Sequence, residues 1–155
     1  MFDVPASAVS PALAAQIALR HYGLVAAAER LPSEFDDTFR RVGGDGPGWL
    51  LKVGADPAAA GGVGFQTALL LHLAAAAPSL PVQRVVAALD GRPEITLWGR
   101  PVRMTSWLDG RLLGARDTNA GLRRDIGRTL ARLNVALRGF AHPGAGRTHR
   151  WDLQR

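Results

Sequence analysis

The sequence of 155 residues contains no cysteine and, beside eighteen arginines, a single lysine, Lys52. The absence of cysteine excludes a disulfide framework, a thiolate metal site and a cysteine nucleophile. The first residues carry no basic side chain ahead of their apolar part and so make a poor signal peptide. These absences favour a cytoplasmic location. They also leave Lys52 as an exception that needs a physical reason.

The chain has one long apolar run, Ala58 to Pro78, whose length would cross a bilayer of about 30 Å. Most of its apolar residues are alanine, three glycines crowd its start, and it contains Gln66 and His72. Alanine contributes little to insertion, and the polar side chains oppose it. We therefore expect no membrane span.

A net charge of +6 could indicate an acidic partner. The arginines are spread from Arg20 to Arg155, and no basic cluster alternates with aromatic residues. We therefore expect no nucleic-acid partner. A basic module for an anionic polymer remains a third reading of the chain, and it predicts binding that weakens steeply with salt.

The first part of the chain predicts a short helix and then three strands. Ser10 is a helix cap, Pro11 suits the first helical position, and Gly23 suits the end. Three short runs follow, separated by turn-forming residues, and predict an antiparallel meander. These runs are residues 24–31, 37–44 and 48–55.

The second part predicts a helix, two or more strands and a long helix. Residues 59–77 place Gln66 on an apolar helical stripe. The next three apolar runs are residues 82–89, 94–99 and 101–108, and they predict a fourth and a fifth strand. A short extra strand among them is an open alternative. In residues 117–140, apolar side chains recur at helical spacing opposite a face of arginines. These side chains are Leu122, Ile126, Leu130, Leu133 and Leu137. The order predicts an α+β fold.

Lys52 lies inside the apolar strand WLLKVG. Alternate residues of a strand share a face, so Leu50 and Lys52 point one way while Trp49, Leu51 and Val53 point the other. A lysine in a sheet loses hydration and persists there when an anion or acceptor meets its ammonium. Lys52 is therefore either a cleft residue that meets an anion or an ordinary lysine on a solvated sheet face.

Several motifs, read in order, resemble one known family. LPSEFDDTFRRV, WLLKVG, FQTALLLHL, PVQRVV and VRMTSWLDG resemble the amino-terminal lobe of the aminoglycoside phosphotransferase-like kinases, with the hydroxylysine-kinase and homoserine-kinase-like branch as the nearest in appearance. The resemblance runs from about Leu24 to Asp152. It implies a protein-kinase-like N-lobe, a five-stranded antiparallel sheet with one packed helix, over residues 1–108 with its leading helix. Residues 109–155 would be the hinge and the first helix of an incomplete helical C-lobe.

The resemblance implies roles for named residues. Lys52 matches the third-strand lysine that contacts the nucleotide α- and β-phosphates. Ser33 and Thr38 belong to the loop that joins the first two strands and would donate to phosphate oxygens, although a plain polar turn is the alternative. Backbone groups near Ser106 and Leu108 match the hinge that binds the adenine edge.

Gln66 occupies the position where much of the family has a glutamate paired with this lysine. A glutamine can still accept a hydrogen bond from the ammonium, but without the charge the pull on Lys52 is weaker.

The His-Gly-Asp catalytic loop of the family is not found, because none of the four histidines opens such a stretch. His149 and Asp152 in HRWD lie ahead of where the catalytic roles are expected. The resemblance thus implies a general base and Mg²⁺ ligands beyond Arg155, and no catalytic or metal-binding residue in this chain.

The function implied is the ATP-binding portion of a small-molecule kinase. Such a kinase moves the γ-phosphate of ATP to a hydroxyl of an amino-acid or aminoglycoside-like substrate, with Mg²⁺. The alternative is a non-catalytic, pseudokinase-type binding module. The apolar stripe of the last helix predicts an exposed surface and self-association.

Overall fold

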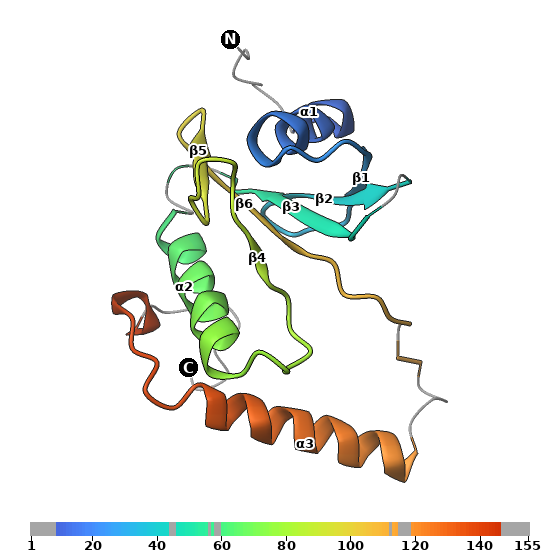
Figure 1. The fold of residues 1–155 in the computed structure, drawn as a ribbon, viewed down its shortest axis with the longest axis vertical. Helices are drawn as coiled ribbons and strands as arrows, with labels where there is room; N and C mark the ends of the chain where they lie inside the picture. Colours follow the sequence, from blue (N-terminus) through green and yellow to red (C-terminus); the bar gives the residue numbers. More distant parts are fainter. Residues whose placement is uncertain are drawn as a thin grey trace.

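A computed structural model of the chain describes residues 9–43, 46–55, 57, 60–111, 113–114 and 119–146. Three α-helices and a mixed-length set of strands make up this part (Figure 1). In chain order the elements are α1 (Pro11–Tyr22), β1 (Ala27–Leu31), β2 (Asp37–Val42), β3 (Trp49–Val53), α2 (Ala60–Ala76), β4 (Val85–Val86), β5 (Ile95–Leu97), β6 (Arg100–Ser106), α3 (Ala120–Ala136) and the 3-10 turn η2 (Pro143–Gly146).

The strands form one antiparallel sheet in the order β1-β2-β3-β6-β4, and β5 pairs with the start of β6. The predicted α+β class and antiparallel sheet are confirmed. The expected number of five strands is exceeded, because β5 and β6 form their own hairpin. Its two turn residues, Trp98 and Gly99, both have positive φ, 53° and 75°, as a tight hairpin turn requires.

The predicted strand over residues 82–89 is much shorter in the structure. Only Val85 and Val86 pair with β6. The Ala88 N–H then donates to Arg92 O at 2.8 Å, which closes a turn and takes the chain away from the sheet. Of residues 82–89 only Ala88 is buried and Leu89 is 70% exposed, so the apolar composition overestimated the length of this strand.

Helix α1 covers one face of the sheet (Figure 1). Its predicted ends are confirmed: Ser10 Oγ accepts from the Leu13 N–H at 3.2 Å, and Gly23 closes the helix at φ 69°. The core between α1 and the sheet is built from the inward residues of both. Its largest members are Ile17, Phe39, Trp49, Leu51, Val53, Val102 and Met104.

Helix α2 lies against the other side of the sheet and packs on β6 and β4. Helix α3 lies farther out, across the end of α2, at the lower edge of Figure 1. Its C-terminal part is tied to α2 by His72 Nε2, 2.8 Å from Ala136 O, and by a ring contact between His72 and Phe140 at 5.2 Å. The order of layers is thus α1, sheet, α2, α3.

The apolar stripe of α3 is exposed at its middle, while Leu122, Leu133 and Leu137 are partly buried. Ile126 is 42% exposed and Leu130 54%. The hollow between α2 and α3 is lined instead by another side of the helix, which includes Ala131 and Val135. No helix in the described part of the chain is long and apolar enough to cross a membrane.

Candidate functional site

Lys52 lies on β3, the middle strand of the five that form the main path of the sheet. Trp49, Leu51 and Val53 are buried in the α1 core. Lys52 therefore points to the opposite face, as its strand phase predicts. This face is the one against which α2 packs.

A row of three polar side chains crosses this face. In the register of the sheet, Lys52 is the direct partner of Thr38 on β2 and of Arg103 on β6. Direct partners in an antiparallel pair have Cβ atoms about 5 Å apart on the same face. Thr38, Lys52 and Arg103 therefore stand side by side across three strands.

The nearest counter-charge of Lys52 is Asp36, in the loop between β1 and β2. Its Oδ2 lies 4.0 Å from Lys52 Nζ, and the two side chains are 25% and 32% exposed. A contact of this length between half-exposed groups contributes little to stability, about 0 to 1 kcal/mol. The ammonium is therefore held loosely and remains available to another anion.

The predicted pairing of Gln66 with Lys52 is wrong in this structure. Gln66 Oε1 accepts instead from an NH2 group of Arg103. The reason is the position of α2, which packs on β6 and β4 rather than on β3, so that the β6 arginine stands between the glutamine and the lysine.

Arg103 was not singled out by the sequence analysis. Its exposed fraction is 7%, and its Nε and NH1 atoms are buried with no hydrogen-bond partner among the described residues. Burial lowers the pKa of the guanidinium, while the charges of Asp36 and Glu94 raise it. A cation between two apolar strand residues, Val102 and Met104, was the available signal, as it was for Lys52 between Leu51 and Val53.

The two hydroxyl residues expected at the nucleotide lie in different surroundings. Thr38 is 5% exposed, and its Oγ1 is buried without a hydrogen-bond partner in the described part of the chain. Ser33 lies exposed in the loop between β1 and β2. The structure therefore places Thr38 in the row with Lys52 and leaves Ser33 on the rim.

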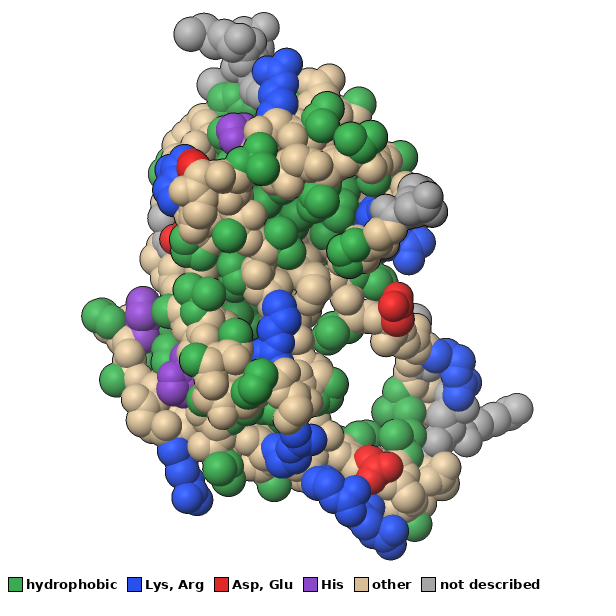
Figure 2. Space-filling view, in the orientation of Figure 1, with side chains coloured by type: hydrophobic (Ala, Val, Ile, Leu, Met, Phe, Trp, Pro, Cys, Tyr) green, Lys and Arg blue, Asp and Glu red, His purple; other side chains and the backbone are tan. Residues whose placement is uncertain are grey.

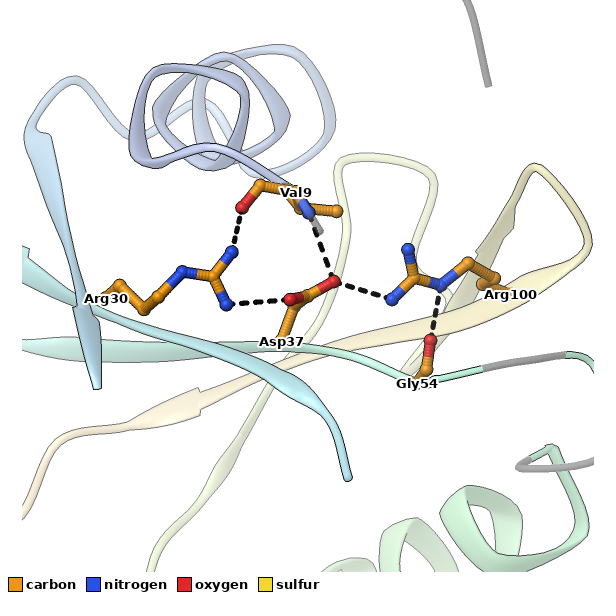
Figure 3. A network of polar contacts seen from close by, with 5 residues as sticks. All are labelled: Val9, Arg30, Asp37, Gly54 and Arg100. Atoms are coloured by element: carbon orange, nitrogen blue, oxygen red, sulfur yellow. Dashed lines mark hydrogen bonds and ion pairs between the residues drawn. The ribbon is translucent and has the colours of Figure 1, made fainter. Parts of the chain in front are cut away.

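Asp37 anchors the end of that loop from the α1 side (Figure 3). Its two carboxylate oxygens accept from Arg30 NH1 and Arg100 NH2, both at 2.7 Å. The Val9 N–H donates to Oδ2 at 3.1 Å. Burial raises the pKa of Asp37, but these hydrogen bonds outweigh it and hold the pKa below its usual value. The hydrogen bonds of Asp37 thus fix the place where the loop that carries Asp36 ends and β2 begins.

The strand that leads to the predicted hinge is tied down at its last residue. The Ser106 N–H donates to Arg84 O at 2.8 Å, and the Trp107 N–H donates to Gly48 O at 2.9 Å. Leu108 follows the paired residues and is 46% exposed. Of the two residues expected to offer backbone groups to a base, Ser106 has its N–H engaged, whereas Leu108 follows the paired residues.

No group of three or more acidic or histidine side chains in the described ranges is placed to hold a metal ion. Among the described residues, Lys52 forms an ion pair with one acidic side chain, that of Asp36. The described residues thus do not fit a Mg²⁺ site. His149 and Asp152 lie outside the described residues.

Comparisons with known proteins agree with this architecture. A family model described as the phosphotransferase enzyme family matches residues 27–155. Two solved structures are similar in fold: amicoumacin kinase hAmiN in complex with AMP-PNP, Ca²⁺ and Ami (TM-score 0.66, 13% identity), and spectinomycin phosphotransferase APH(9)-Ia in complex with ADP and spectinomycin (TM-score 0.59, 9% identity).

Each similarity covers 82% of this chain, but only 40% of the first and 37% of the second structure. The chain therefore spans less than half the length of these neighbours. No curated protein matches it.

Proposed function

The chain belongs to the phosphotransferase enzyme family, and on that premise we propose that it forms the nucleotide-binding lobe of a small-molecule kinase. The kinase would transfer the γ-phosphate of ATP to a hydroxyl of an amino-acid or aminoglycoside-like substrate. The observation that carries the proposal is Lys52, held on the central strand and turned away from the core. The hydroxylysine-kinase and homoserine-kinase-like branch stays part of this proposal.

The physical argument concerns charge. An ammonium on a half-buried strand is a compact point donor that neutralises phosphate oxygens. Among the described residues, Lys52 has only the carboxylate of Asp36, 4.0 Å away, as its ion-pair partner. A phosphate group therefore offers it a stronger, charge-assisted contact than the folded chain does.

The same face offers a place for the base. Leu50 is two residues before Lys52 on β3, shares its face, and is 8% exposed. This apolar side chain lies toward the end of β6 that leads to Leu108, because Leu50 pairs with Thr105. A nucleotide would then place its base near Leu50 and the Leu108 backbone, and its phosphates near Lys52 and Thr38.

The two structural neighbours support this reading through what they contain. One holds AMP-PNP and Ami, and the other holds ADP and spectinomycin, so each combines a nucleotide with a small molecule. In this chain the helical lobe is represented by α3 and the segment after it, so the substrate proposed here is a class rather than a compound.

A second candidate function is a non-catalytic nucleotide-binding module. The observation that favours it is Gln66, a neutral residue that is bonded to Arg103 and leaves Lys52 without a helix-borne carboxylate. Such a module would bind ATP through the same row and transfer no phosphate.

Calorimetric titration of ATP into the chain, with and without Mg²⁺, tests the proposal. We expect weak binding that Lys52→Met removes almost entirely, because an ammonium-phosphate contact contributes about 1.5 to 3 kcal/mol, roughly a tenfold to hundredfold change in affinity. Lys52→Arg should restore only part of it, since a planar guanidinium on a longer stem cannot take the same position.

The matched control for lost charge is Arg128→Gln, because Arg128 lies exposed on α3 and pairs with Asp125. Equal ATP binding by the wild type and both Lys52 variants would contradict the proposal.

A further inference from the structure

We propose that Arg103 is a second cationic ligand for the nucleotide phosphates, beside Lys52, so that the two side chains and Thr38 form one polyphosphate-binding row. This inference rests on the function proposed above and adds a residue to the site. It starts from the sheet register, in which Thr38, Lys52 and Arg103 are direct partners across β2, β3 and β6.

The second observation is unused hydrogen-bonding capacity within this row. Thr38 Oγ1 and the Nε and NH1 atoms of Arg103 are all buried and have no partner among the described residues. A buried donor without a partner costs about 1 to 3 kcal/mol, and more when it is charged. Two residues of one row that both carry unpaired buried atoms indicate a site built for a ligand with several acceptor oxygens.

The charge of Arg103 is also poorly compensated. Its NH2 group donates to Gln66, a neutral acceptor. The two carboxylates that act on it, Asp36 and Glu94, are engaged elsewhere: Asp36 lies 4.0 Å from Lys52, and Glu94 Oε2 accepts from Thr67 Oγ1 at 2.9 Å. A guanidinium matches phosphate geometry with two parallel hydrogen bonds, from NH2 together with either Nε or NH1, so a phosphate that replaces the Gln66 oxygen would accept from NH2 and from one of the two free atoms.

Lys52 provides the opening to solvent. Its side chain is 32% exposed, while Arg103 beside it is nearly covered. A phosphate that enters at Lys52 meets Arg103 on the neighbouring strand once the guanidinium turns from Gln66. The flexible arginine stem permits this turn. When no nucleotide is bound, the hydrogen bond to Gln66 would hold the Arg103 guanidinium in its observed position.

The test compares three probes on the same protein: ATP, inorganic tripolyphosphate and adenosine. Binding of each to the wild type, Arg103→Gln, Arg103→Lys and Arg128→Gln is measured by calorimetry at low and moderate salt. We expect Arg103→Gln to lose at least tenfold in affinity for ATP and tripolyphosphate and nothing for adenosine. Arg103→Lys should recover part of the loss, and Arg128→Gln should match the wild type.

The adenosine titration separates a ligand role from a structural one. A purely structural Arg103 would lower affinity for all three probes together, or lower thermal stability without any change in the affinity of the folded protein. Either result overturns the inference. Circular dichroism on each variant confirms that the titrated protein is folded.

The two proposals fail in different ways. If ATP binds and depends on Lys52 but not on Arg103, this inference is wrong and the proposed function stands. Suppose instead that tripolyphosphate binding depends on Arg103, that ATP binds no more tightly than tripolyphosphate, and that adenosine does not bind. The anion site then stands, and the proposed nucleotide function is wrong. If the wild type binds none of the three probes, both are wrong.

Discussion

At the scale of single residues, Asp37 is a carboxylate that accepts hydrogen bonds from three separate parts of the fold. From β2 it joins Val9, two residues ahead of α1, to Arg30 on β1 and Arg100 on β6. Its hydrogen bonds bring its pKa below the usual value despite burial. The ionised form is therefore the one that the folded state prefers.

This preference gives stability a pH dependence with a definite sign. A carboxyl whose folded-state pKa is depressed contributes stability that is fully present above its unfolded pKa of about 3.9 and is lost as pH falls through the folded pKa. We predict that Asp37→Asn lowers the free energy of unfolding at pH 7 by about 2 kcal/mol. The difference from the wild type should shrink below about pH 4.

Urea denaturation of both proteins between pH 2 and pH 7 measures this difference. The matched control is Asp125→Asn, since Asp125 forms an exposed ion pair with Arg128 and should matter by less than about 0.5 kcal/mol. A pH-independent gap between Asp37→Asn and the wild type would show that the charge of Asp37 is not what stabilises the network.

Features of single residues that depend on neighbours in the sequence could be predicted, whereas those that depend on distant segments could not. The face of Lys52 was predictable from the two-residue period of a strand, and the α1 core confirms it. The partner of Gln66 was not, because it depends on which strand α2 packs against, and a helical stripe does not encode that choice. Arg103 in PVRMTSW could have been predicted in the same way as Lys52 in WLLKVG, because each is a cation between two apolar residues of a strand.

At the scale of elements, the turn from β2 to β3 is held against the end of β6 by a single glycine. A Cβ placed on Gly48 would lie 2.8 Å from Trp107 Cβ, closer than real Cβ contacts. The Gly48 carbonyl also accepts the Trp107 N–H at 2.9 Å, so neither segment can move away without loss of that bond.

We therefore predict that Gly48→Ala destabilises the fold by about 1 to 3 kcal/mol through overpacking. Gly127→Ala, in the middle of α3 with no atom within 4 Å of the added Cβ, should instead raise helix stability by about 0.5 to 1 kcal/mol. Thermal melts followed by circular dichroism compare the two. A neutral Gly48→Ala would mean that the Trp107 segment yields easily.

Elements with strong local signals were predicted best. The caps of α1 gave its bounds correctly, and the apolar run at 59–77 gave those of α2 to within one residue. The period of α3 located this helix, but the predicted range of 117–140 is longer than the observed Ala120–Ala136. The short strands β4 and β5 were harder, because their lengths are set by pairing with β6 and by the turns at residues 88–92 and 98–99. Apolar composition alone does not reveal where such pairing ends.

At the scale of the whole molecule, α3 lies outside the hydrophobic core that α1 forms with the sheet. Figure 2 shows an opening between α3 at the lower edge and the segment that follows β6, with arginine side chains along the helix. No residue of α3 is buried. Its contacts with the rest of the described fold lie at the end of α2 and include Arg132 NH2, 2.9 Å from Ser79 Oγ.

The middle of the apolar stripe of α3, Ile126 and Leu130, is therefore exposed in the described fold. Leu122, Ile126 and Leu130 line a shallow groove that points away from the hollow beside α2. Apolar surface of this kind drives association in water, because each buried side chain contributes about 1.5 to 3 kcal/mol. The stripe was predictable from its helical period, whereas its separation from the α2 contact was not.

We predict that the chain self-associates through this stripe and that Leu130→Glu weakens the association at least tenfold, because a carboxylate would have to be buried in an apolar contact. Sedimentation velocity over a hundredfold range of concentration measures the apparent mass. Arg124→Gln is the control, since it changes the net charge by the same amount on the opposite side of the helix and should associate like the wild type. The melting temperature of Leu130→Glu should stay close to that of the wild type, because Leu130 is 54% exposed and packs on no part of the described core. A wild-type chain that stays monomeric at every concentration would show that α3 finds its cover within the same molecule.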